Sequence, residues 1–251
     1  MNIQAALNAG KPVVYFPTDN YLVAQPLIIP DHVQHLIGLG GVTITSQSPL
    51  RNTTRAIFQV IGRQTKPLWI EGFELKNTGS AFFIEHNSPR PLVISNSGVS
   101  GYRNLYPNNQ LFLEDVVGVR FYFKDQKVWA RQIDVESGRE SGNINIDNNH
   151  SDLWILGLKT ERDVPIITTH NQGKTEVLGG FLYGNRNIPE NIAAFLNQKS
   201  SQSLVFAGYH YPFEPYIRET RQGKSRELQP DELYSIKYGR MTPLFVGYQS
   251  N

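Results

Sequence analysis

The residues best suited to chemistry are the three tryptophans, because all of them occupy the same place in a recurring pattern. Trp69, Trp129 and Trp154 each follow the first aliphatic residue of a short apolar run. Successive side chains of a β-strand point to opposite faces, so the indoles lie opposite Leu153 and Ile155, which we assign to the core. An outward column of indoles is suited to stacking on sugar rings. The alternative is that a loop, a partner chain or another domain covers them, since large aromatic patches are seldom left bare.

Cleavage of a polysaccharide also requires two carboxyl groups, and two glutamates are spaced for that role. Glu136 and Glu161 take equivalent positions in adjacent repeats, and Glu176 lies one repeat after Trp154. Stacked repeats would bring such carboxylates to about 5 Å, the separation typical of retaining glycosidases. A solvated pair of surface acids remains the alternative. Both glutamates lie about seven residues past their tryptophans, so we expect them on the next face of the repeat, which argues against a shared groove.

Other kinds of site find little support. The chain has no cysteine, and its six histidines show no metal-ligand spacing, so we expect neither a metal site nor a cofactor. His150 and His170 stand in Asn-rich turns, where hydrogen bonds to the turn backbone are the expected role. Arg131 is a candidate for holding an anionic sugar substituent. A second group, Arg218, Arg221 and Arg226, is expected to pair with Glu219 and Glu227 across a hairpin.

The charge and hydropathy patterns argue against two kinds of partner, nucleic acids and membranes. The net charge is +2, from 24 basic and 22 acidic residues that are scattered along the chain without a block of like charges. We therefore expect no nucleic-acid partner. No apolar run approaches 18 residues and no secretory signal follows Met1, so we expect no membrane segment.

The elements that must position these side chains follow from an internal repeat. Residues 142–163 align without a gap on residues 164–185, with Ile155 over Val177, Leu156 over Leu178 and Gly157 over Gly179. Related apolar runs start at Leu68, Leu92, Leu111, Val128, Leu153 and Thr175. The runs are too short for helices, the leucine-rich-repeat frame is missing, and a propeller blade needs about twice this period. The pattern predicts an all-β, single-stranded parallel β-helix of about 22 residues per coil.

The repeat also predicts the corners and the ends of the solenoid. The repeated glycine marks a corner, and Asp115 replaces it in one coil. A short helix over residues 3–7 is expected to cap the first coil. A β-hairpin around residues 222–224 is expected to cap the last. The predicted domains are a parallel β-helix with its N-terminal cap helix over 1–185 and a C-terminal cap with the hairpin over 186–251.

Several stretches resemble a known family. "IQAALNAGKPVVYFPTDNYLV" looks like the entry of the pectate-lyase superfamily of right-handed parallel β-helices, in its polygalacturonase-related branch. The stretches "LFLEDVVG", "KVWARQID", "LWILGLKTE" and "GKTEVLGGFLYG" resemble an uncharacterised bacterial subgroup of it. Asp19-Asn20 departs from the glycine usual in the entry turn. The resemblance implies a right-handed solenoid, a polysaccharide ligand and an extracellular or cell-surface location.

The family's two known catalytic sets cannot be carried over. There is no dense calcium-binding Asp cluster, and the N-x-D, D-D, G-H-G and R-I-K pattern of polygalacturonases is absent. We therefore expect binding of a polysaccharide or oligosaccharide rather than strong hydrolase or lyase activity. The alternative is a structural or assembly module whose aromatic face docks a companion β-helix or a second copy. If the corner residues Leu156 and Leu178 point inward, replacing either by Asp would prevent folding.

Overall fold

The protein is an all-β parallel β-solenoid of about eight turns, with about 5% of its residues in helices. The computed structural model describes residues 2–74, 79, 82–136, 145–161 and 163–247. The chain forms two compact units, Met1–Val117 and Gly118–Asn251. The predicted boundary between β-helix and C-terminal cap, at 185/186, lies inside the second unit and stays a prediction.

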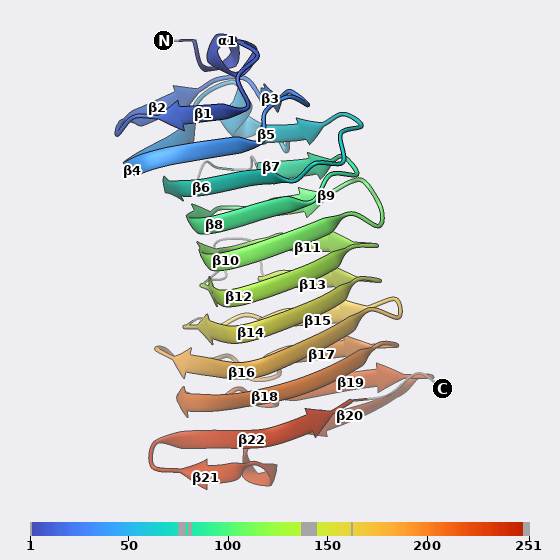
Figure 1. The fold of residues 1–251 in the computed structure, drawn as a ribbon. Coiled ribbons are helices and arrows are strands. Elements are labelled where there is room, and N and C mark those ends of the chain that lie inside the picture. Colours follow the sequence, from blue (N-terminus) through green and yellow to red (C-terminus); the bar gives the residue numbers. More distant parts are fainter. Residues whose placement is uncertain (1, 75–78, 80–81, 137–144, 162, 248–251) are drawn as a thin grey trace. The chain divides into compact units, whose positions relative to one another are not determined.

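The first unit holds a short helix and the strands that stack after it. Strands β1, β4, β6 and β8 pair in parallel as one sheet, with β2 also on β4, while β3, β5, β7 and β9 form a second parallel sheet (Figure 1). The elements are α1 (Ile3–Leu7), β1 (Val13–Phe16), β2 (Asn20–Val23), β3 (Leu27–Ile29), β4 (His35–Ser46), β5 (Ala56–Ile61), β6 (Leu68–Glu74), β7 (Phe82–Asn87), β8 (Leu92–Val99), β9 (Tyr102–Asn104) and β10 (Gln110–Gly118).

The second unit repeats this arrangement and ends in antiparallel strands. Strands β12, β14, β16 and β18 pair in parallel and are followed by the antiparallel β22 and β21, while β11, β13, β15, β17 and β19 pair in parallel and are followed by the antiparallel β20. The elements are β11 (Phe121–Lys124), β12 (Lys127–Val135), β13 (Ile146–Asn149), β14 (Asp152–Thr160), β15 (Ile167–His170), β16 (Lys174–Gly184), β17 (Phe195–Gln198), β18 (Ser201–His210), β19 (Ile217–Arg221), β20 (Lys224–Leu228), β21 (Tyr234–Ile236) and β22 (Gly239–Val246).

The gapless alignment of 142–163 on 164–185 predicts the observed register, although residues 142–144 and 162 lie outside the described ones. Leu153 pairs with Thr175, Ile155 with Val177 and Leu156 with Leu178, as adjacent parallel strands. Asp152 pairs with Lys174 in the same register, and their charged atoms lie 4.0 Å apart. A surface ion pair of this kind stabilises the fold by less than about 1 kcal/mol.

The predicted corners are confirmed by the backbone. The long strands bend at a residue with positive φ: Gly157 in β14 has φ +85°, and Gly179 in β16 has φ +89°. In β12 the equivalent residue is Gln132, with φ +54°. In β10, Asp115 takes the glycine's place with φ +51°, as predicted. Each strand thus runs along one face of its coil, turns, and continues along the next.

The prediction that Leu156 and Leu178 face inward is wrong. Leu156 is 56% exposed and Leu178 is 50% exposed, while Leu153 and Ile155 are buried. Alternation along a strand explains the result, because the residue after a buried Ile155 must point outward, and the bend begins only at Gly157. An aspartate at either leucine position would therefore meet solvent rather than the core.

The interior of the second unit contains a ladder of polar residues. Asn148, Thr169, Asn197 and Glu219 are successive partners in β13, β15, β17 and β19, and all four are buried. The Asn197 side-chain amide donates to Glu219 Oε1 at 2.9 Å. Buried polar groups are costly unless they are hydrogen-bonded, so this ladder specifies the register of the stacked coils.

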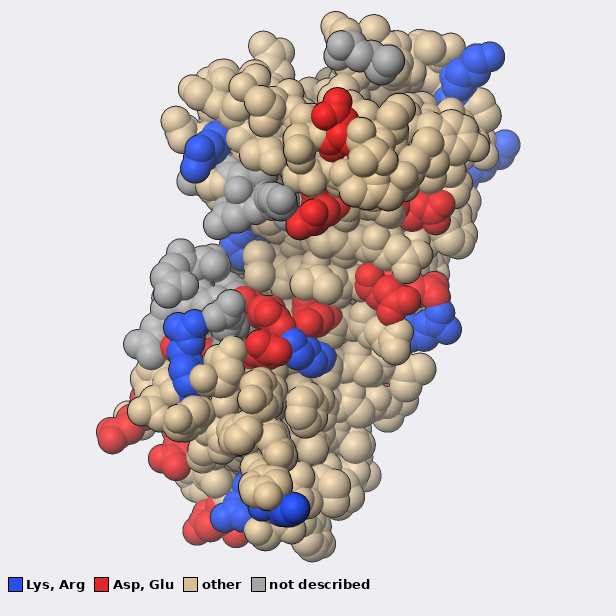
Figure 2. Space-filling view, turned by 90° about the vertical axis from the view of Figure 1, so that its left-hand side faces the viewer, with Lys and Arg blue, Asp and Glu red and all other residues tan. Residues whose placement is uncertain are grey.

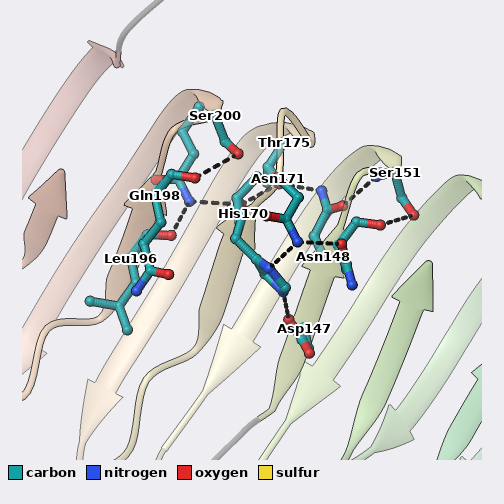
Figure 3. Close-up of polar contacts among 12 residues, drawn as sticks. Asp147, Asn148, Ser151, His170, Asn171, Thr175, Leu196, Gln198 and Ser200 are labelled. Carbon is teal, nitrogen blue, oxygen red and sulfur yellow. Dashed lines mark hydrogen bonds and ion pairs between the residues drawn. The ribbon is translucent and has the colours of Figure 1, made fainter. Parts of the chain in front are cut away.

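Asn148 shows how one rung of the ladder is satisfied (Figure 3). Its Nδ2 donates to the Lys174 carbonyl at 2.9 Å and to Thr175 Oγ1 at 2.8 Å. Its Oδ1 accepts the backbone N–H of Ser151 at 3.0 Å. One side chain therefore ties the turn that follows β13 to the start of β16, three strands later in the chain.

The helix α1 forms over Ile3–Leu7, as predicted from the sequence. The Gln4 side chain takes the place of a neighbouring strand in hydrogen bonding. Its Nε2 donates to the Ile28 carbonyl at 2.9 Å, and its Oε1 accepts the Ile28 N–H at 2.8 Å. One side chain thereby satisfies both backbone groups of Ile28 in β3. The predicted hairpin also forms, as β19 and β20 pair around Gln222 and Gly223.

The first unit encloses a buried group around His86. Its Nδ1 lies 3.0 Å from the Tyr102 hydroxyl, and its Nε2 lies 2.9 Å from the Arg90 carbonyl oxygen. Arg90 is itself fully buried and donates to the carbonyls of Lys66, Val33 and Pro67. Burial lowers the pKa of His86 to about 4, despite the opposing hydrogen bond to Arg90.

Candidate functional site

The candidate site lies on the outer side of β12, β14, β16 and β18, on the stretch that follows the bend of each strand. Alternation after the bend points two residues per strand outward. The first positions hold Asp134, Lys159, Phe181 and Ala207, which are successive partners across the strands. Two residues later come Glu136, Glu161, Tyr183 and Tyr209, and the two tyrosines are strand partners. Charged and aromatic side chains thereby gather on one face of the second unit.

The charged part of the site centres on one lysine. Lys159 Nζ contacts Glu136 Oε1, lies 2.5 Å from Glu161 Oε1 and lies 3.2 Å from Asp134 Oδ2. Asn185 Nδ2 donates to the other oxygen of Glu161 at 3.2 Å. Three carboxylates surround one ammonium, so the cluster carries net negative charge while its carboxylates are ionised.

The pKa values follow from this crowding. Burial, with the nearby Glu136 charge adding to it, raises the pKa of Asp134 to about 6, although the Lys159 ammonium opposes the change. Burial alone would lower the pKa of Lys159, but its hydrogen bonds to Glu136, Glu161 and Asp134 outweigh this and raise it. The lysine therefore stays charged, and the raised pKa lets Asp134 take up a proton at a higher pH than an ordinary aspartate, near pH 6.

The aromatic part of the site adjoins this cluster. The ring centroids of Phe181 and Tyr183 lie 6.2 Å apart with planes 14° from parallel, and those of Tyr183 and Tyr209 lie 6.0 Å apart at 24°. Phe181 is 45% exposed. His210 meets Tyr183 and Tyr209 edge-on, and Tyr238 meets Tyr209 edge-on. We call the rings of Phe181, Tyr183 and Tyr209 the aromatic platform: Tyr183 is nearly parallel to each of the other two, whose planes lie 37° apart.

Figure 2 looks onto the side where β14 and β16 end, and shows acidic side chains gathered around a basic one beside an uncharged stretch of surface. The backbone register accounts for this neighbourhood, because Lys159 is the partner of Phe181 and Thr160 is the partner of Leu182. Adjacent coils lie about 4.8 Å apart, so a ligand of one or two sugar rings would reach both parts.

Two of the predicted site residues, Trp129 and Trp154, lie side by side on the face that precedes the bend. They point outward and are half-buried, with ring centroids 5.3 Å apart and planes 11° from parallel. The predicted outward indoles are thus realised in the second unit as one stacked pair.

The remaining predicted residues are dispersed. Trp69 is 43% exposed and lies in the first unit, opposite His35. Arg131 is exposed and is the partner of Leu156, while Glu176 is half-buried and is the partner of Trp154. These side chains lie on the face before the bend, so the structure does not bring them together with Glu136 and Glu161.

Glu136 and Glu161 do occupy the next face, as predicted, and the ammonium of Lys159 joins their Oε1 atoms. A glycosidase pair must hold the scissile bond between its carboxyl groups. Here a lysine occupies that place, which favours a binding role over cleavage. Among the described residues, no group of three or more His, Cys, Asp and Glu is arranged to hold a metal ion.

The expected role of two histidines is corrected by the structure. His150 Nδ1 lies 2.6 Å from Asp125 Oδ1, and His170 Nε2 lies 2.5 Å from Asp147 Oδ1. Figure 3 shows His170 between Asp147 and Asn171. Both imidazoles thus pair with carboxylates of the preceding coil rather than with turn backbone. Both ring nitrogens of His170 are engaged, because its Nδ1 also contacts Asn171 at 3.1 Å.

Sequence reasoning singled out Glu136 and Glu161 but missed Asp134, Lys159 and the platform as parts of one site. The signal was present for Asp134, Lys159, Phe181 and Tyr183, which stand two or four residues after the corner residue of their coil, whereas β18 has no such corner residue before Tyr209. Counting outward positions from the corner, rather than from the start of each apolar run, would have aligned them.

Comparisons with known proteins leave the family open. No protein-family profile matches the chain, and no curated protein does. Two solved structures are similar to it at 10% identity. One is ORF18 of Geobacillus virus E2, with TM-score 0.32 over 81% of this chain, which spans 55% of that protein. The other is PfbA, a surface adhesin of Streptococcus pneumoniae, with TM-score 0.33 over 90% of this chain and 95% of that one.

In the part of the chain that the structure describes, no helix is long and apolar enough to cross a membrane.

Proposed function

We propose that this protein binds a polysaccharide or oligosaccharide on the second unit, with the aromatic platform as the main contact. The observation that carries the proposal is the arrangement of Tyr183 nearly parallel to Phe181 and Tyr209 beside hydrogen-bonding charged groups. Sugar rings have an apolar face and a polar rim. An aromatic surface bordered by carboxylates and an amide matches both.

The proposal is for binding rather than cleavage. Lys159 bridges Glu136 and Glu161, so neither glutamate is placed to act alone as acid or nucleophile. We expect no reducing ends to be released when the protein is incubated with plant or algal polysaccharides. Release of reducing ends that Glu161→Gln abolishes would show instead that the pair is catalytic.

Binding is tested by removing one ring of the platform. We expect Tyr183→Ala to weaken oligosaccharide binding about three- to tenfold, because one aromatic contact contributes roughly 1 kcal/mol. The melting temperature should change little, since the ring lies on the surface. Isothermal titration calorimetry with the best ligand from a glycan array measures the change.

The matched control for this variant is Tyr234→Ala, because Tyr234 is 66% exposed in β21 and lies outside the platform. It should bind as the parent protein does. Trp154→Ala tests the face before the bend, and the platform predicts a smaller loss there than at Tyr183. Equal binding by the parent and Tyr183→Ala would contradict the proposal.

A second function, a structural or assembly module, is favoured by a separate observation. Leu156 and Leu178 are half-exposed on adjacent strands, next to the stacked Trp129 and Trp154. Such a patch fits a companion β-helix or a second copy of the chain. Under this proposal the double variant Leu156→Asp/Leu178→Asp converts an oligomer into a monomer, as light scattering after gel filtration would measure.

The proposal also covers the handedness and coil length of the solenoid, its family and its cellular location. We infer a right-handed winding with about 22 residues in a coil, and kinship with the pectate-lyase superfamily. Support comes from the 22-residue offset of Leu156 and Leu178. Further support comes from the Gln4 contacts at β3 and the antiparallel strands β20 and β22, which fit caps at the two ends. An extracellular or cell-surface location follows from that kinship.

A further inference from the structure

We propose that the glycan recognised by the platform is one that carries free amino groups, a polymer of 2-amino-2-deoxyhexose, rather than a uronate. This inference rests on the proposed function and narrows it to one ligand class. It is carried by the charge that borders the platform. Asp134, Glu136 and Glu161 contribute three carboxyl groups and Lys159 contributes one ammonium, so the two glutamates still outnumber the lysine when Asp134 is protonated.

The geometry places this charge where a sugar on the platform would extend. Lys159 is the strand partner of Phe181, which is exposed while the other two rings of the platform are half-buried. Thr160 and Leu182 are the next pair of strand partners, and Glu161 and Tyr183 come directly after them in the chain. A sugar ring against the exposed Phe181 would therefore project its substituents toward the charged groups of the neighbouring coil, about 4.8 Å away.

An ammonium group suits this border for two reasons. It can replace or join Lys159 as a donor to Glu136 and Glu161, forming charge-assisted hydrogen bonds. It also gains from the faces of nearby Tyr and Phe rings, which attract cations. A uronate carboxylate would face the net negative cluster and be repelled.

The opposite end of the platform has a different charge. Lys237 Nζ lies 5.0 Å from the Tyr238 ring centroid, and Tyr238 borders Tyr209. The basic group thus lies beyond Tyr209, while the acidic cluster lies beside Phe181 and Tyr183. We therefore expect the amino groups of the glycan to bind at the acidic end of the platform, beside Phe181 and Tyr183.

The experiment compares three β-1,4-linked hexasaccharides that share one backbone and differ only at C2: glucosamine, N-acetylglucosamine and glucose. Calorimetry at about pH 6, where the amine is largely protonated, should show the glucosamine hexamer binding several-fold tighter than either neutral hexamer. Raising the salt concentration tenfold should remove most of that preference, because exposed charges are screened. Trigalacturonate should not bind.

Two variants assign the preference to the cluster. Glu161→Gln keeps the shape and removes one charge, so it should weaken glucosamine-hexamer binding about two- to fivefold and weaken binding of the neutral hexamers less. Lys159→Gln removes the competing ammonium and should strengthen glucosamine binding instead. Asp152→Asn is the matched control, because Asp152 begins the same strand, β14, that Glu161 follows.

The outcomes separate the two levels of the proposal. If neutral hexamers bind and the amine adds nothing, or if Glu161→Gln and Asp152→Asn behave alike, the amino-sugar inference is wrong and polysaccharide binding stands. If trigalacturonate binds most tightly, the charge argument is overturned. If none of the four ligands binds and Tyr183→Ala has no effect on any array glycan, polysaccharide binding itself falls, and the inference with it.

Discussion

Ile155→Asp will leave the second unit unable to fold, whereas Leu156→Asp, one residue further along the same strand, will be tolerated. Ile155 is 1% exposed and pairs with Val177 in the next coil, so an aspartate there would bury an unpaired charge. Such a change costs more than about 4 kcal/mol, a large share of the 5–15 kcal/mol that stabilises a typical domain. Soluble expression and a cooperative thermal transition measure the difference.

Leu156→Asp is the internal control for that result. Leu156 is 56% exposed and faces Arg131 across the strands, so the new carboxylate meets water and a basic neighbour. We expect a change in unfolding free energy within about 0.5 kcal/mol. A cooperative melt from Ile155→Asp, or insoluble protein from Leu156→Asp, would show that the assignment of inner and outer faces in β14 is wrong.

Acidification from pH 7 to pH 4 will destabilise the first unit through His86. In the folded protein burial holds the pKa of His86 at about 4, against about 6.5 in the unfolded chain. Between these values the unfolded state binds a proton that the folded state does not, so stability falls as pH falls. At about 1.4 kcal/mol per pH unit, the loss reaches roughly 3 kcal/mol near pH 4. Hydrogen exchange of the β7 and β9 amides at a series of pH values measures it.

His86→Gln separates this effect from general acid unfolding. Glutamine keeps a donor and an acceptor near Tyr102 and Arg90 but does not titrate in this range. The variant will be less stable at pH 7, and its exchange rates should depend less on pH between 6.5 and 4. An unchanged pH dependence would assign the loss to other groups. Asp134 works in the opposite direction, because its raised pKa makes protonation favour the folded second unit.

The sequence by itself was sufficient to predict the parallel solenoid, because each coil repeats the same local pattern of residues. Short alternating runs place Leu153 and Ile155 inside and Trp154 outside, and the glycines at 157 and 179 permit the left-handed backbone that turns the strand. These features depend on neighbours in the chain. They could be read without knowing which coil lies next to which.

The candidate site depended on information that local patterns do not contain. Corresponding residues are 25 apart from Trp129 to Trp154, 22 apart from Trp154 to Glu176 and 27 apart from Glu176 to Ser203. The lengths of the intervening turns set these offsets, so a constant period of 22 aligns only some of the outward residues. The corner leucines were misplaced for a related reason, as the sequence showed a bend near 157 but not on which side of it the alternation broke.

The sequence alone determined that acidic and aromatic side chains would line the outside of stacked coils, because alternation and repetition are local properties of the chain. Only the tertiary structure decided that Lys159 would join Glu136 to Glu161 and that Tyr183 would lie nearly parallel to Phe181 and Tyr209 beside them. The reason is physical. An ion pair or a ring stack forms over a few ångströms between residues some 25 positions apart, so it depends on the register of neighbouring coils and on the rotamers that packing allows.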